Sequence, residues 1–207
     1  GSVLIGNVAD RIGRRPTILG CLVVMTAGMF AATMASGVEM LSVIRFLTGI
    51  GIGGMLSSTS AMVAEFSNDK RRGLNVALNI AGYSTGAILG GLVASALLAS
   101  TGDWRSVFML GGVASAAMIP LAVFFLPESI ESLIARRPAG ALETINRTLV
   151  RLGHAAVAAL PALPEVRVKP SIASLFARDF RWITILLPVA YFAQILFFYY
   201  IQKWIPK

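Results

Sequence analysis

The sequence predicts an all-α, multi-pass membrane protein, and three observations support that fold class. Of the 207 residues, 56% are hydrophobic and 14% are charged, and the mean hydropathy of +0.76 exceeds that of ordinary soluble domains. Several apolar stretches have the ~20 residues that a helix needs to cross a bilayer. The basic residues lie between these stretches, so the net charge of +8 indicates membrane-surface loops and argues against a nucleic-acid partner.

The apolar stretches divide the chain into spans bounded by charged residues, proline or glycine. Residues 1–8 are also apolar and run directly into a charged cluster, so they predict the last turns of a preceding helix. The five spans that we place are residues 17–37, 40–64, 74–99, 106–126 and 182–206.

The basic residues orient these spans. Three connections on one side hold 14 of the 18 Lys and Arg residues. The other side holds only Arg105, Lys203 and Lys207, and Arg45 lies inside a span. The positive-inside rule therefore makes the three basic connections cytoplasmic and predicts an inner (plasma) membrane location.

Residues 127–181 form the one long polar region. Residues 139–153 have apolar side chains at helical spacing, with Arg147 and Arg151 opposite, which predicts a short amphipathic helix at the cytoplasmic face. A flexible basic linker is an equally good interpretation. His154, the only histidine, has no nucleophile or metal partner in register, and Cys21 is the only cysteine, so we expect no enzyme activity, metal or cofactor.

The connection between the first two helices carries a specific motif. Residues 6–15 fit the pattern G-x-x-x-D-R-x-G-R-R, in which one glycine allows close helix approach, the other a tight turn, and the acid can pair with the arginines. A generic stop-transfer cluster would explain the arginines but not the glycines and the acid at fixed offsets. The motif resembles the loop between helices 2 and 3 of the major facilitator superfamily, where it gates alternating access. The resemblance places this gating role on Gly6, Asp10, Arg11, Gly13, Arg14 and Arg15.

This resemblance implies a partial helical bundle of that superfamily, from the end of helix 2 through helix 7. It assigns residues 1–126 to the N-terminal bundle, 127–181 to a cytoplasmic central loop and 182–207 to helix 7, the start of the second bundle. The family's mechanism implies alternating access between two six-helix bundles.

Two charged residues of the second full span are candidates for coupling. A cation such as Arg45 inside an apolar span is costly unless it faces water, an acid or carbonyl groups. The run after it resembles the family's helix 4 motif R-x-x-x-G-x-G, which implies a role in proton transfer, while a structural arginine remains the alternative. Glu65 ends the same span and is expected to pair with a loop arginine, and Gly49 is expected to serve helix packing.

The third full span carries glycines at every fourth position, Gly82, Gly86 and Gly90, which predicts a smooth packing stripe. Antiporters of the superfamily have a proline where this chain has Ala87, which favours a symporter or uniporter. The remaining candidates for substrate or proton coupling are Asn79 and Tyr83, which share a helix face, and Tyr191 and Gln194 of the last span.

The stretches 45–65, 103–112 and 126–129 together resemble the aromatic acid:proton symporters. The resemblance implies proton-coupled uptake of an aromatic or related organic acid by a monomeric carrier in the lipid bilayer. A carrier of sugars or other metabolites stays open as the alternative, whereas a nutrient sensor would need a long signalling domain, for which the polar region 127–181 is too short and plain. Ser57 and Ser58 replace the Pro-Asn that many family members have, which leaves room for a different substrate.

Overall fold

A computed structural model describes residues 2–161 and 181–204, and within these ranges it consists of α-helices and connections without a strand. The all-α fold class is therefore confirmed. The chain divides into two units, residues 1–162 and 163–207. The first unit contains α1 (Ser2–Ile12), α2 (Arg14–Thr33), α3 (Val38–Glu65), α4 (Arg72–Thr101), α5 (Trp104–Phe125), α6 (Ile130–Arg136) and α7 (Ala141–Arg151), and the second contains α9 (Arg181–Trp204).

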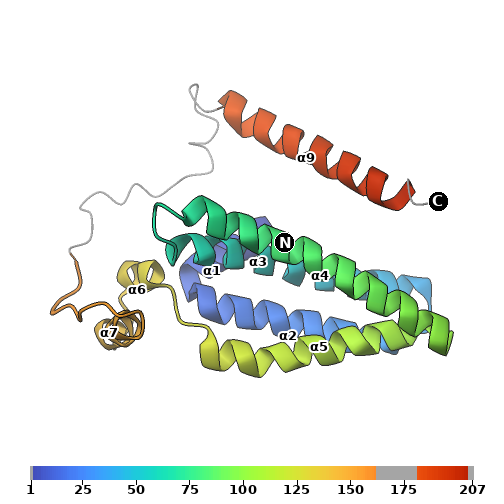
Figure 1. Ribbon diagram of the computed structural model, residues 1–207, viewed down its shortest axis with the longest axis horizontal. Helices are drawn as coiled ribbons and strands as arrows, with labels where there is room; N and C mark the ends of the chain where they lie inside the picture. Colours follow the sequence, from blue (N-terminus) through green and yellow to red (C-terminus); the bar gives the residue numbers. More distant parts are fainter. Residues whose placement is uncertain (1, 162–180, 205–207) are drawn as a thin grey trace. The chain divides into compact units, whose positions relative to one another are not determined.

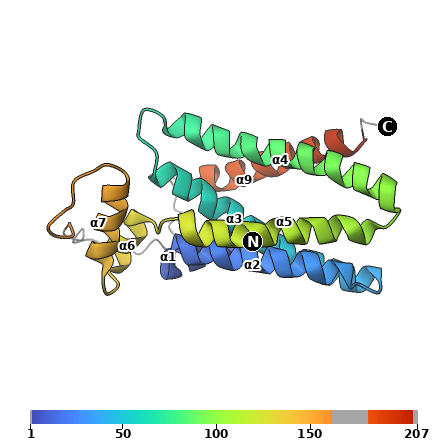
Figure 2. The ribbon, with the colours of Figure 1, turned by 60° about the horizontal axis from the view of Figure 1, so that its bottom comes forward.

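Four long helices of the first unit run back and forth between two ends (Figures 1 and 2). We call one the basic end, because it holds the α1–α2 junction, the α3–α4 connection and the segment after α5. The other, the far end, holds the α2–α3 and α4–α5 connections (Figure 2). Helix α2 packs along α3 and α5, whereas α4 has looser contacts with α3 and α5.

The helices α2, α3, α4 and α5 are the described helices that are long and apolar enough to cross a membrane. They match four of the five predicted spans, with ends that differ by up to four residues. The fifth predicted span coincides with α9 except for residues 205 and 206, which lie outside the described residues. That α9 crosses the membrane stays a prediction.

Burial is concentrated where α2 meets α3 and α5. The buried side chains of α2 include Ile18, Cys21 and Leu22, whereas α4 has no buried residue. Large apolar side chains on α4, such as Leu89 at 58% exposure, would be unfavourable in water. The outer surface of these helices therefore fits hydrocarbon.

The polar region after α5 begins with a helix that the sequence analysis missed. Helix α6 spans Ile130–Arg136, and the Ser129 hydroxyl caps it by accepting the N–H of Ser132 at 3.1 Å. A helix was predicted over residues 139–153, and α7 confirms it over Ala141–Arg151. Of the two interpretations that were left open for this segment, the helix is correct there.

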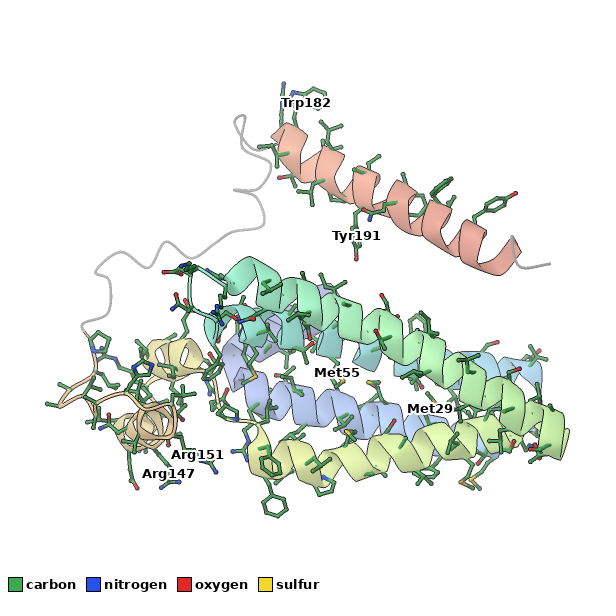
Figure 3. The ribbon with its side chains drawn as sticks, in the orientation of Figure 1. Met29, Met55, Arg147, Arg151, Trp182 and Tyr191 are labelled. Atoms are coloured by element: carbon green, nitrogen blue, oxygen red, sulfur yellow. The ribbon has the colours of Figure 1, made fainter. Side chains whose placement is uncertain are left out.

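The buried face of α7 packs within the first unit. Ile145 is 2% exposed and Leu133 of α6 is 5% exposed, and these two helices are in contact. The chain leaving α7 is held by Asn146, whose amide donates to the carbonyl of Val157 at 3.0 Å and accepts its N–H at 2.9 Å. In Figure 3, Arg147 and Arg151 project from α7. The rest of the predicted central loop, residues 162–180, lies outside the described residues.

Candidate functional site

The site at the basic end begins with a sharp break between two helices. Helix α1 ends at Ile12 and α2 begins at Arg14, and Gly13 between them has φ +115°, a region that side chains with a Cβ rarely adopt. A Cβ at this position would also lie 2.6 Å from Nη2 of Arg136 and 2.8 Å from Oε2 of Glu128. Glycine therefore permits both the turn and the close approach of two charged side chains.

Because Gly13 is the N-cap residue of α2, it brings no side chain to accept the first N–H groups of the helix. Glu128, from the segment after α5, takes this role. Its Oε1 accepts the backbone N–H of Arg14 at 3.0 Å and of Arg15 at 3.2 Å, and also that of Ser129 at 3.1 Å. A carboxylate suits the positive end of a helix dipole, so this contact joins the start of α2 to the end of α5.

Glu65, the last residue of α3, forms the shortest ion pair in the described part of the chain. Nε of Arg14 donates to Oε1 of Glu65 at 2.6 Å, and the Ser129 hydroxyl donates to the other oxygen, Oε2. The carboxyl side chain of Glu65 is 11% exposed, so the pair is only partly reached by solvent. Arg14 also approaches Asp10 at 3.8 Å, but Asp10 is 70% exposed, which makes this second pair the weaker one.

Arg136 of α6 completes the site from the other side. Its Nη2 lies 4.0 Å from Oε2 of Glu128, and its Nε donates to the hydroxyl of Ser132 at 3.2 Å. Its Nη1 donates to the carbonyls of Ile12 and Arg11. These carbonyls lie at the C-terminal end of α1, where no following turn of the helix supplies N–H groups to them. We call the whole set the polar cluster, and its members are Asp10, Arg14, Glu65, Glu128, Ser129 and Arg136.

The predicted gating motif is brought into this cluster only in part. A Cβ at Gly6 would have no heavy atom of the described chain within 4 Å, and Arg11 takes part through its carbonyl. The expected charge pairing of Glu65 with an arginine is confirmed by its contact with Arg14. The motif residues that meet in or directly beside the cluster are Asp10, Gly13, Arg14 and Arg15.

Three cluster members carried no predicted role: Glu128, Ser129 and Arg136. The stretch Leu126–Ser129 was noted only as a family resemblance. The sequence did contain a signal for Glu128. This acid follows Pro127 directly after an apolar span, which places it at the same membrane depth as the other charged helix ends.

Of the residues predicted for coupling, Glu65 lies in the cluster, whereas the others do not form one site with it. Arg45 and Glu65 are 20 residues apart on α3, which separates them by about 30 Å of helix rise. Asn79 donates to the Ser60 hydroxyl at 3.2 Å and lines an otherwise largely apolar cavity of about 310 Å³, and Tyr83 is 56% exposed. The two remaining candidates, Tyr191 and Gln194, are exposed side chains of α9 in the second unit.

The predicted packing glycines face open space within the described chain, because no heavy atom lies within 4 Å of where a Cβ would be. Their packing role stays a prediction, and they are Gly49, Gly82, Gly86 and Gly90. Close helix contacts occur instead at Gly51, where a Cβ would lie 3.3 Å from the carbonyl of Cys21, and at Gly112, where it would lie 2.9 Å from the ring of Phe30.

Four long apolar helices define a polytopic helical membrane protein, and paired charges at the basic end join α1, α2, α3 and the segment after α5. The chain belongs to the major facilitator superfamily, whose family model matches residues 1–207. All of it aligns with the 4-hydroxybenzoate transporter PcaK of Acinetobacter baylyi (30% identity, 46% of that protein) and with a gallate transporter of Pseudomonas putida (30% identity, 46% of that protein). An antiporter of Candida albicans is 32% identical over 62% of this chain and 25% of its own length. The chain thus spans about half the length, or less, of these curated relatives.

Proposed function

We propose that this chain is part of a secondary active transporter that takes up an aromatic or related organic acid together with protons. Family membership supports the transporter class, and the names of the two relatives that align with the whole chain support the substrate class. In this proposal residues 1–126 form most of one bundle, residues 127–181 the cytoplasmic central loop and residues 182–207 the start of the second bundle. The carrier works as a monomer in the inner membrane by alternating access.

The polar cluster is the observation that carries the proposal. It ties α1, α2, α3 and the segment after α5 together at the basic end, through charges that, apart from the exposed Asp10, are only partly exposed. Breaking such a pair leaves charges without partners in a region of low solvent access, so the paired arrangement is a discrete state. We therefore assign the cluster, including Glu65, to the cytoplasmic gate.

The residues that we assign to substrate and proton coupling lie away from this gate. Arg45 is a cation within a span, and Asn79 and Tyr83 supply an amide and a phenol one helical turn apart on α4. Tyr191 and Gln194 of α9 supply similar groups from the second unit. A carboxylate with an aromatic ring matches this combination of one cation, hydroxyls and amides.

The substrate and coupling are tested by uptake of radiolabelled 4-hydroxybenzoate into cells that produce the full-length transporter, with and without a proton uncoupler. We expect saturable accumulation that the uncoupler abolishes. Accumulation that resists the uncoupler would overturn symport, and competition by sugars but not by aromatic acids would overturn the substrate class.

The gate is tested by Asp10→Asn and Glu65→Gln in the same assay. Removing one charge from a partly buried, hydrogen-bonded ion pair weakens the interaction between the partners by about 1–3 kcal/mol. Glu65→Gln should therefore alter transport more than Asp10→Asn, because the Asp10 side chain is exposed in its pair with Arg14. Asp69→Asn is the matched control, because Asp69 is an exposed acid in the α3–α4 connection. Unchanged kinetics in both cluster variants, at equal membrane abundance, would contradict the gate.

A further inference from the structure

A second group of interacting side chains lies at the far end of the bundle, around Arg45. Cζ of Arg45 on α3 lies 5.1 Å from the centroid of the Phe108 ring on α5. Its Nη1 lies 3.7 Å from the sulfur of Met29 on α2, a residue that Figure 3 labels. Three helices therefore meet at one guanidinium group.

The Phe108 ring also contacts Trp104, which lies one helical turn earlier on α5. These two rings have centroids 5.6 Å apart and planes at 87°, an edge-to-face arrangement that aromatic pairs favour. Trp104 in turn lies under the guanidinium of Arg105 at 5.1 Å, and Arg105 donates to the carbonyl of Ala35 in the α2–α3 connection at 3.2 Å. These contacts connect the Phe108 ring, through Trp104 and Arg105, to the backbone carbonyl of Ala35. They hold the Phe108 ring in its orientation.

Small residues bring the three helices close enough for this arrangement. A Cβ at Gly111 would lie 3.4 Å from the sulfur of Met29, so Met29 packs directly on α5 one turn after Phe108. On the other side, Thr48 of α3 is 1% exposed and packs against Gly28 of α2. Arg45 is one helical turn before Thr48, so its side chain starts on the face of α3 that meets α2.

The contacts of Arg45 orient its charge without neutralising it. A cation over an aromatic face is attracted by the ring quadrupole, and neither Phe108 nor Met29 carries a formal charge. None of the ion pairs in the described chain includes Arg45. Nη1 of Arg45 donates a weak hydrogen bond to the Met29 sulfur, and a guanidinium has five N–H donors in all, so others can bind a carboxylate.

We propose that Phe108, braced by Trp104, is a positioning residue that holds the Arg45 guanidinium for the carboxylate of the transported acid. This inference rests on the proposed transport function and names the partner of Arg45. The cation–π contact orients the guanidinium, and the carboxylate of the substrate binds it.

The test uses the full-length transporter and the labelled aromatic acid of the uptake assay. Phe108→Leu should raise the KM for uptake about 2- to 10-fold, with a smaller change in maximal rate per transporter, because the leucine side chain has no aromatic face. Phe108→Tyr should restore the parental KM, since the ring remains. Phe124→Leu is the matched control, because Phe124 lies on the same helix with 74% exposure.

A double-mutant cycle separates positioning from a general packing effect. In an Arg45→Gln background, which has no cation to contact the ring, Phe108→Leu should change KM by less than about twofold. Trp104→Leu should also raise KM. It replaces Phe108→Leu in the test if that variant does not reach the membrane. Equal KM increases in both backgrounds, or equal impairment by Phe108→Tyr and Phe108→Leu, would overturn the inference while transport stands. Absence of aromatic-acid uptake by the parent would overturn the proposed function instead.

Discussion

Gly13 has a backbone conformation that decides which residues can replace it. Its φ of +115° lies outside the regions open to residues with a Cβ, and two charged side chains occupy the space beside it. We expect Gly13→Ala to lower the stability of the folded transporter by about 1–3 kcal/mol, measured as a lower melting temperature in detergent. Gly20→Ala is the control, because Gly20 is helical and a Cβ there meets no described atom within 4 Å, so alanine should be neutral or stabilising.

Ser58 gives a prediction in the opposite direction. Its side chain is 1% exposed, and its hydroxyl oxygen has no hydrogen-bond partner within the described chain. Burying an unsatisfied hydroxyl is unfavourable, so Ser58→Ala should raise stability by about 1 kcal/mol. Ser115→Ala provides the comparison, because the Ser115 hydroxyl donates to the carbonyl of Gly111 at 2.8 Å and its loss should not stabilise. A lower melting temperature for Ser58→Ala would show that this hydroxyl has a partner in the whole protein.

At the residue scale, the sequence identified the motif positions but, apart from the pairing of Glu65 with an arginine, not their partners. The glycine, acid and arginines of residues 6–15 were recognisable because their spacing is local. The contact of Glu128 with Arg14 spans 114 residues, and no local pattern in a single sequence encodes which distant acid will cap a helix. The same limit applies to Arg45 and Phe108, whose meeting depends on how α3 and α5 pack.

At the scale of elements, the start of α2 depends on a side chain from elsewhere. Glu128→Ala removes the acceptor of the first N–H groups of α2, and we expect a loss of about 1–2 kcal/mol in stability, with a partial loss for Glu128→Gln, whose amide oxygen still accepts. Thermal melting of the purified variants measures both. Glu131→Ala should have a smaller effect, since Glu131 is an exposed residue of the neighbouring α6. Equal effects of the two alanine variants would remove the capping role.

The elements themselves were predictable to different degrees. The long spans were found because about 20 apolar residues bounded by charges leave few alternatives to a helix in lipid. Helix α7 was predicted because its apolar residues recur at helical spacing. Helix α6 has seven residues, too few for a periodic pattern to stand out, so its only sequence signal was the Ser129 cap.

At the scale of the whole molecule, the orientation of the spans is open to direct measurement. Cys21 is buried, and replacing it with alanine gives a background for single cysteines at Asp69 in the α3–α4 connection and Ser36 in the α2–α3 connection. A membrane-impermeant maleimide should label Ser36→Cys in intact cells, and Asp69→Cys only after permeabilisation. Labelling of both positions from the same side would contradict an odd number of crossings between them.

Helix α2 is fastened to its neighbours at both of its ends, and this has a mechanical consequence. At the start of α2, Glu128 accepts hydrogen bonds from the first N–H groups of the helix. Just beyond the end of α2, Arg105 donates a hydrogen bond to the carbonyl of Ala35. In the proposed alternating-access cycle we therefore expect α2, α3 and α5 to move together as one rigid group. Helix α4 has no buried residue and looser contacts with α3 and α5, so we expect it to shift most easily, with bending at the α3–α4 connection and at Gly102.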